Sequence, residues 1–432
     1  MIDKRLAEEI LGIALSGGGD FAEIYQELTK NGNVRLLDGK IEAIGDNVLS
    51  GVGIRTFIGT QTVYATTTDI TREGLIRCAR SVAEAVGEIK GAVSVRLCER
   101  IFPNIHPVTQ VPATADMKYK LDLLKSACTT AKNYHESIVQ VGGTLLTVDH
   151  SILVANSEGL YTTDRHIRTR MAVNAVASNG KENQSGSCAP GRGMGLEVFD
   201  LFKPEDIGHE AARQAVVNLN ADYCKAGKMT VAIENGFGGV IFHEACGHSL
   251  EATSVAIGAS QMAGKLGQMI ANPKVTAIDD GTIPNAWGSV NIDDEGNPTQ
   301  RNVLIENGVL KSYMIDRLGS RRMGLPMTGN SRRQGYDYEP TSRMTNTFID
   351  NGPDKNEDII ASIEYGLYCK EMGGGSVNPL TGAFNFAVRA RSDLCFRGLA
   401  PRHRNGKESR LSRGRSLRLL HLRSGQSQGS VR

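Results

Sequence analysis

The chain has 432 residues, of which 40% are hydrophobic and 22% are charged, and its formal net charge is +2. This composition is typical of an ordinary globular protein, and the length predicts more than one domain. The charge is unevenly distributed: the residues from Arg389 onward carry a net +10, and those before them a net −8. An acidic body with a basic end gives no continuous basic surface, so we expect no nucleic-acid partner.

The N-terminus predicts a protein of the cytoplasm without a membrane anchor. The first ten residues are charged and amphipathic, and no apolar secretory segment follows them. The chain has no run of about 18 apolar residues that would span a membrane. Its eight cysteines are scattered, with no Cys-x-x-Cys pair, so we expect reduced thiols that pack as buried side chains.

Three Asp-Gly or Asn-Gly pairs between apolar runs predict β-hairpins with two-residue turns. They are Asp38-Gly39, Asn179-Gly180 and Asn307-Gly308. Strands are expected beside them, over residues 34–37, 51–58, 160–177 and 303–314.

Helical periodicity occurs between these hairpins, over residues 75–86, 119–131 and 204–217. Hairpins with inserted helices predict a multi-domain α+β protein built on antiparallel sheets. Linker-like sequence near residues 102–113 and 221–228 divides the chain into expected domains. These are an N-terminal domain of residues 1–105, a middle domain of residues 106–225, a C-terminal domain of residues 226–388 and a basic tail of residues 389–432.

The segment from His243 to His248 reads His-Glu-Ala-Cys-Gly-His. Two histidines and a glutamate are typical of a metallopeptidase helix, in which the histidines bind zinc and the glutamate activates water. The common motif spaces its histidines four residues apart, but here they are five apart, about 140° round a regular α-helix. We therefore predict a π-type widening or a break between Glu244 and His248, with Gly247 easing the distortion.

Other polar residues allow more than one interpretation. Cys246 packs as a small apolar side chain or serves as a poorly placed thiolate ligand. The acidic run of residues 293–295 lacks the alternation of an EF-hand and predicts a solvated turn. Arg332 and Arg333 bind a substrate carboxylate or belong to a solvated loop. His166 lies in an exposed-looking strand, and we predict no role for it.

Around these residues the chain resembles the TldD/PmbA family. Residues 242–251 are similar to the His-Glu-x-x-x-His helix of that family, and the similarity extends over residues 21–388. Further similar segments are residues 51–55, 293–296, 303–308, 343–347 and 373–375. The zinc motif points to the TldD-like subunit, because the PmbA-like partner, also called TldE, typically lacks it.

This resemblance implies a cytoplasmic zinc peptidase that trims unfolded or flexible peptides inside an enclosed chamber. It implies a hetero-oligomer with a PmbA/TldE-like partner. It also implies that His243 and His248 are zinc ligands and that Glu244 is the catalytic general base. The family's third ligand, a cysteine in a C-terminal Cys-Gly-Lys segment, has no counterpart in this chain.

The composition changes after Val388, where a segment rich in Arg, Ser, Gly and Leu begins. It resembles a frame-shifted reading that replaced the native C-terminus, and a genuine basic tail that binds RNA or an acidic surface is the alternative. We expect this tail to be disordered and the peptidase activity to be impaired. The alternative function is a non-catalytic subunit, or a modulator that binds peptide without cleaving it, assembled with the PmbA-like partner.

Overall fold

The computed structural model describes residues 1–91, 93–223, 229–378, 380–381, 383–391 and 408–410. The chain folds into two compact units. The first unit contains residues 1–216, 280–301 and 314–346, and the second contains the remaining segments. The chain therefore leaves the first unit and returns to it twice. Antiparallel sheets with inserted helices in both units confirm the predicted α+β class.

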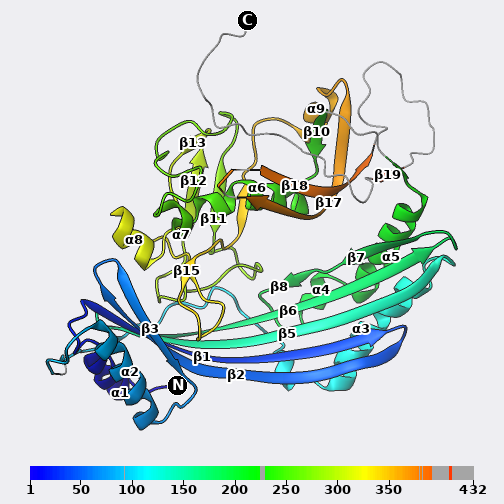
Figure 1. Cartoon of the computed structure of the whole chain (residues 1–432). Coiled ribbons are helices and arrows are strands. Elements are labelled where there is room, and N and C mark those ends of the chain that lie inside the picture. Colours follow the sequence, from blue (N-terminus) through cyan, green and yellow to red (C-terminus); the bar gives the residue numbers. More distant parts are fainter. Residues whose placement is uncertain (92, 224–228, 379, 382, 392–407, 411–432) are drawn as a thin grey trace, which may run out of the picture. The chain divides into compact units, whose positions relative to one another are not determined.

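An eight-stranded sheet forms the framework of the first unit (Figure 1). Its main path runs β3-β2-β1-β5-β6-β4, while β7 and β8 also pair with β6. Every pair is antiparallel except that of β4 with β6. The strands are β1 (Phe21–Leu37), β2 (Lys40–Ile58), β3 (Gln61–Thr67), β4 (Cys98–Glu99), β5 (Ile138–Asn156), β6 (Leu160–Ser178), β7 (Asn183–Cys188) and β8 (Gly191–Arg192).

The hairpin turns follow the Asp-Gly and Asn-Gly signals in two cases out of three. Asp38 and Gly39 connect β1 to β2 with φ of 47° and 77°, as a type I′ turn requires. Asn307 and Gly308 have φ of 49° and 82° between β12 and β13. The third prediction is wrong, because β6 and β7 are joined by four residues, 179–182. There the Asn179 side chain accepts the N–H groups of residues 181 and 182, both at 3.0 Å, which forms a wider turn.

Helices pack on the first sheet at two places: α1 and α2 beside β1 and β2, and α3 beside β5 and β6. Leu75 and Val82 of α2 are buried with Ile10 of α1 against Ile24 and Ile54 of the strands. The predicted helices of residues 75–86, 119–131 and 204–217 are confirmed as α2, α3 and α5. The helices of this unit are α1 (Lys4–Ala14), α2 (Arg72–Val86), η1 (Pro112–Thr114), α3 (Met117–Lys132), α4 (Val198–Leu201), α5 (Pro204–Asn220, whose last residues lead into the second unit) and α8 (Arg317–Met323).

The start of β1 is buried on both faces, because side chains alternate along a strand. Ile24 faces the helices, whereas Glu23 and Tyr25 face the segments that return to this unit. On that face Glu23 accepts a hydrogen bond from Arg55 at 3.1 Å, and Arg55 also binds Glu295. Burial of a carboxylate costs free energy unless a cation or hydrogen-bond donors lie beside it.

The expectation of a solvated turn at residues 293–295 is therefore wrong. Asp293 is 3% exposed and Glu295 is fully buried. Asp293 accepts the backbone N–H groups of Glu295, Asn297 and Ser331 at 2.9 to 3.1 Å, and Glu295 pairs with Arg55. The sequence pattern did not indicate this burial, because Ser331 and Arg55 lie far away in the chain.

The second unit contains two sheets. One has the order β10-β17-β18-β19-β9 and the other β13-β12-β11-β16. Their strands are β9 (Asp222–Tyr223), β10 (Thr230–Ile233), β11 (Ala277–Asp280), β12 (Arg301–Glu306), β13 (Val309–Leu310), β16 (Thr347–Ile349), β17 (Gly366–Asn378), β18 (Ala383–Arg391) and β19 (Glu408–Arg410). The helices are η2 (Gly236–Gly239), α6 (Val240–Ala245), η3 (Gly247–Leu250), α7 (Ala252–Val255) and α9 (Asn356–Ala361).

Little of the basic tail lies within the described residues. Residues 389–391 end β18, and residues 408–410 form β19, which pairs with β18 and β9. The rest of residues 389–432, for which disorder is expected, lies outside the described residues. In the part of the chain that is described, no helix has the length and apolar character needed to cross a membrane.

Candidate metal centre

The His243–His248 segment is a helix that breaks in the middle. Helix α6 ends at Ala245, and the 3-10 turn η3 begins at Gly247. Cys246 joins them with φ of −123° and ψ of −45°, outside the helical region. The predicted distortion is thus a break rather than a π-turn, and it is centred on Cys246 rather than on Gly247.

The break brings the two imidazole rings of the motif together. The ring centroids of His243 and His248 are 4.9 Å apart, with an angle of 83° between the ring planes. Ligand atoms of these histidines and of Glu244 all lie within 4.8 Å of one another. Two imidazole nitrogens and a carboxylate oxygen are a donor set that suits a divalent transition metal. Among the residues that the structure describes, this is the one group of three or more such donors.

Each histidine is oriented through its Nδ1 atom. His243 Nδ1 lies 3.3 Å from the hydroxyl of Thr347, the first residue of β16. His248 Nδ1 lies 3.2 Å from Oε1 of Glu251, a carboxylate that is 5% exposed. Metal-binding histidines commonly use one ring nitrogen for such a partner, which fixes the ring and leaves the other nitrogen for the metal. The Nε2 atoms are therefore the candidate ligands.

Sequence reasoning had not identified these two orienting residues. Thr347 lies 104 residues after His243 and reaches it because β16 pairs with β11, with Thr347 opposite Asp279. Glu251 is three residues after His248, a spacing that places side chains on one side of a helical turn. That spacing was the one available signal.

Cys246 is partly buried between the two histidines. Burial raises the pKa of its thiol to about 11. This favours the interpretation of Cys246 as a small packing residue. Cys395, in the altered C-terminal sequence, lies outside the described residues.

The other candidate residues belong to the first unit. Arg333 is 8% exposed and pairs with the buried Glu23, so its guanidinium group is committed inside the protein. Arg332 is exposed. His166 is partly buried, with Nε2 2.6 Å from Oδ2 of Asp164, so the expectation of an exposed histidine is wrong.

Three family models match consecutive parts of the chain. The PmbA/TldA metallopeptidase domain 1 matches residues 22–86, the central domain matches residues 111–219, and the C-terminal domain matches residues 226–392. The His243–His248 segment lies inside the third match. Residues 393–432 lie outside all three.

Curated relatives match over most of their length. A Metalloprotease TldD homolog from Haemophilus influenzae is 34% identical over 383 residues, which are 85% of this chain and 78% of that protein. A metalloprotease from Methanocaldococcus jannaschii is 31% identical over 395 residues, covering 90% of this chain and 85% of the relative.

Solved structures share the fold at lower sequence identity. A candidate modulator of DNA gyrase from Bacteroides thetaiotaomicron has a TM-score of 0.75 and 17% identity, covering 94% of this chain and 89% of that one. TldE from Thermococcus kodakarensis has a TM-score of 0.68 and 21% identity, covering 90% and 85%.

Proposed function

Because the chain belongs to the PmbA/TldD family of metallopeptidases, we propose that it hydrolyses peptide bonds at a zinc site formed by His243 and His248. The observation that carries this proposal is the convergence of the two rings and Glu244 at the helix break. Two imidazole nitrogens that bind the metal, beside a glutamate that acts as the base, are typical of metallopeptidase zinc sites. Flexible or unfolded peptides are the proposed substrates.

Each residue of the site would have a separate role in peptide-bond hydrolysis. His243 and His248 hold the metal through Nε2, while Thr347 and Glu251 keep the two rings from turning. A metal ion held there supplies Lewis acidity toward the peptide carbonyl and makes water more acidic. Glu244, whose Oε2 lies 3.9 Å from His248 Nε2, takes a proton from water and delivers it to the leaving amine.

The proposed ligand set is incomplete in the described residues, which favours a second candidate function. Catalytic zinc usually has three protein ligands, and with Glu244 acting as base only the two histidines remain. A weakly held metal would leave a non-catalytic subunit or a peptide-binding modulator. Metal content and hydrolysis, measured on the same sample, distinguish the two.

Glu244→Gln tests the proposal. We expect the variant to keep the metal content of the unaltered chain, because both histidines remain. Hydrolysis of a fluorogenic peptide should fall by about 10²- to 10⁴-fold, because the general base is lost. Elemental analysis and initial rates are the measurements.

Glu306→Gln is the matched control, since Glu306 is an exposed carboxylate of the same unit, bonded to Lys311 at 3.3 Å. It should change neither quantity. Unchanged hydrolysis in Glu244→Gln would exclude Glu244 as the base. A metal-free chain that cleaves no peptide would favour the non-catalytic function.

We further propose a PmbA/TldE-like partner. The proposal is supported by the fold shared with TldE from Thermococcus kodakarensis. Co-expression with a PmbA-like chain, followed by size-exclusion chromatography, should give a mixed complex. A monomer that cleaves peptides unaided would contradict it.

A further inference from the structure

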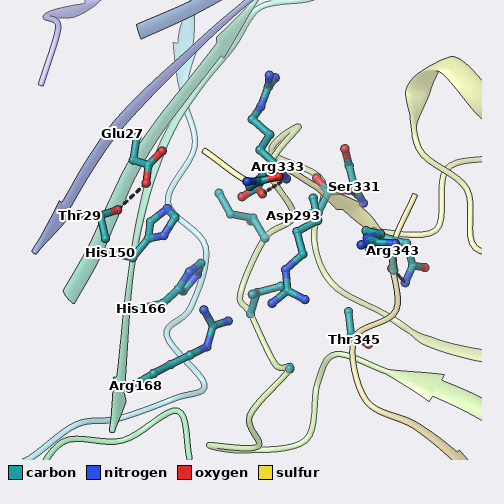
Figure 2. Close-up of a pocket in the computed structure, with 18 of the residues that line it drawn as sticks. Glu27, Thr29, His150, His166, Arg168, Asp293, Ser331, Arg333, Arg343 and Thr345 are labelled. Atoms are coloured by element: carbon teal, nitrogen blue, oxygen red, sulfur yellow. Dashed lines mark hydrogen bonds between the residues drawn. The ribbon is translucent and has the colours of Figure 1, made fainter. Parts of the chain in front are cut away.

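The first unit has a cavity that the metal centre does not explain. Its volume is about 300 Å³, and all residues that line it belong to the first unit. The sheet forms one wall, and three loop segments near residues 288–294, 329–334 and 343–345 form the other (Figure 2). This volume lies at the lower end of the range for small-ligand pockets, so it suits a chain end or one side chain.

Strand register places a row of polar side chains on the sheet wall. Thr29 of β1 lies opposite His150 of β5, and His150 lies opposite His166 of β6. Arg168 is two residues beyond His166 and therefore projects from the same face. Figure 2 shows the side chains of His150, His166 and Arg168 directed from the strands into the cavity.

Hydrogen bonds of the neighbouring residues hold the backbone at Arg332 in the opposite wall. On either side of it, the N–H of Ser331 donates to Asp293 at 3.1 Å, and the N–H of Arg333 donates to Asp294 at 2.6 Å. Because side chains alternate in β14 (Ser331–Arg332), Ser331 and Arg333 are buried whereas Arg332 is exposed and lines the cavity. Pairing of Arg332 with Thr341 of β15 (Thr341–Ser342) stabilises this arrangement.

Arg168 and Arg332 bring two positive charges close together in the cavity. Burial and the nearby charge of Arg332 together lower the pKa of Arg168 to about 10, against a smaller opposing effect of Asp294. Arg168 donates through Nε to the carbonyl of Trp287 at 3.0 Å. Within the described part of the chain, neither guanidinium group forms a salt bridge with a carboxylate.

Most carboxylates that line the cavity accept hydrogen bonds from the protein itself. Asp293 accepts bonds from the backbone, and burial together with the nearby Glu295 raises its pKa. Glu27 accepts the hydroxyl of Thr29 and the N–H of Tyr336, and burial raises its pKa too. Asp294 is the remaining acid, and the lining has four arginines, residues 168, 332, 333 and 343, against three acids.

We propose that this cavity binds a carboxylate of a peptide ligand, which is held by the guanidinium groups of Arg168 and Arg332. Guanidinium groups recognise carboxylates through paired charge-assisted hydrogen bonds, and an incoming anion would relieve the repulsion between the two arginines. The ligand class rests on the proposed peptidase function, because that function is what brings peptides to this protein. The arrangement itself does not depend on the metal.

Binding of three N-acetylated pentapeptides tests the inference. The first has a free C-terminus and no acidic residue, the second has a central Glu and a C-terminal amide, and the third has a central Gln and the amide. Their affinities for the full-length Glu244→Gln chain are measured by calorimetry, and mass spectrometry confirms that the peptides stay intact. We expect the first or the second to bind about tenfold or more tightly than the third. Tighter binding of the first peptide would identify the C-terminal carboxylate as the bound group, and tighter binding of the second would identify a Glu side chain.

Arg168→Met and Arg332→Met should each remove this preference. Arg332 is exposed, so its variant decides the question even if Arg168→Met fails to fold. Arg322→Met, at an exposed position on α8, is the matched control and should keep the preference. A carboxylate that binds at the metal instead would keep its preference in both cavity variants.

Equal affinity for all three peptides, or a preference that survives both cavity substitutions, would overturn the inference. Hydrolysis by the unaltered chain is measured separately. Arginine-dependent binding without hydrolysis would refute the peptidase function alone. Hydrolysis without any carboxylate preference would refute the cavity proposal alone.

Discussion

The orientation of two imidazole rings by Thr347 and Glu251 is the most specific feature of the proposed metal centre at the scale of single residues. Both partners contact Nδ1, at 3.3 and 3.2 Å. A ring held at one nitrogen loses less rotational freedom when the other nitrogen binds a metal. The orienting residues should therefore contribute to metal affinity although neither is a ligand.

Thr347→Val removes the hydroxyl group that orients His243 and keeps nearly the same volume. We expect zinc affinity to fall about 10- to 100-fold, the usual cost of losing such a partner. Competition with a chromogenic chelator gives the affinity. Thr230→Val, at an exposed position on β10, is the control and should have no effect. Equal affinities in both variants would show that Thr347 does not orient the ring.

His150 should make the stability of the first unit depend on pH. Burial, with smaller contributions from His166 and Arg168, lowers the pKa of His150 to about 4, whereas an unfolded histidine titrates near 6.5. As the pH falls below about 6.5, the unfolded chain takes up a proton that the folded protein does not. This histidine should therefore lower the free energy of unfolding by about 2 kcal/mol at pH 5 relative to pH 7.

His150→Gln should reduce the loss of stability between pH 7 and pH 5 by that amount. Urea unfolding followed by the fluorescence of Trp287, the single tryptophan of the chain, measures it in the first unit. His135→Gln, at an exposed position, controls for the loss of a histidine. Parallel pH profiles for the unaltered chain and His150→Gln would contradict the assignment.

At the scale of elements, the sequence allowed prediction of those turns and helix breaks that depend on residues close together in the chain. The turns at Asp38 and Asn307 formed as expected because two residues with positive φ suffice for a type I′ turn. The break in the metal helix followed from the five-residue spacing of its histidines. The turn at Asn179 did not follow, because the side chain of Asn179 bonds two successive N–H groups.

Gly39 and Gly308 allow a matched test of turn glycines. Both have positive φ, 77° and 82°, but an added Cβ meets nothing within 4 Å at Gly39. At Gly308 it would lie 2.5 Å from the carbonyl oxygen of Ala271 and 2.6 Å from Sδ of Met269. Gly39→Ala should cost roughly 1–2 kcal/mol from backbone strain alone, and Gly308→Ala should cost about 1–3 kcal/mol more from crowding.

Hydrogen exchange of the amides in each hairpin gives the local opening free energy for both variants. A larger loss at Gly39 than at Gly308 would contradict the crowding argument.

At the scale of the whole molecule, the parts of a site that come from distant segments could not be predicted. The two histidines and Glu244 were identified because they are close in sequence. Thr347 was not, and neither was the proximity of Arg168 and Arg332 across a cavity. Strand register and returning segments bring these residues together. Family resemblance supplied the expectation of a third ligand, which the residues alone did not.

Replacement of residues 389–432 by a family-like C-terminus with a Cys-Gly-Lys segment tests whether the chain lacks a ligand. We expect zinc affinity and kcat/KM to rise by orders of magnitude, because a third ligand completes the usual catalytic site. The same replacement with serine in place of that cysteine is the control and should give neither gain. The prediction fails if the unaltered chain already binds zinc and cleaves peptides as well as the replaced one.

The buried ion pairs of Glu23 with Arg55 and Arg333, and of Arg55 with Glu295, also constrain how the protein can be made. Glu23 and Arg333 are 310 residues apart in the chain. At about 5–20 residues per second, a ribosome needs roughly 15–60 s to travel that distance. During that time β1 and β2 have been synthesised and Glu23 can pair with Arg55, but Glu23 still lacks Arg333, and Arg55 still lacks Glu295. Completion of the first unit must therefore wait until most of the chain has left the ribosome, and the nascent protein carries an unfinished core for most of its synthesis.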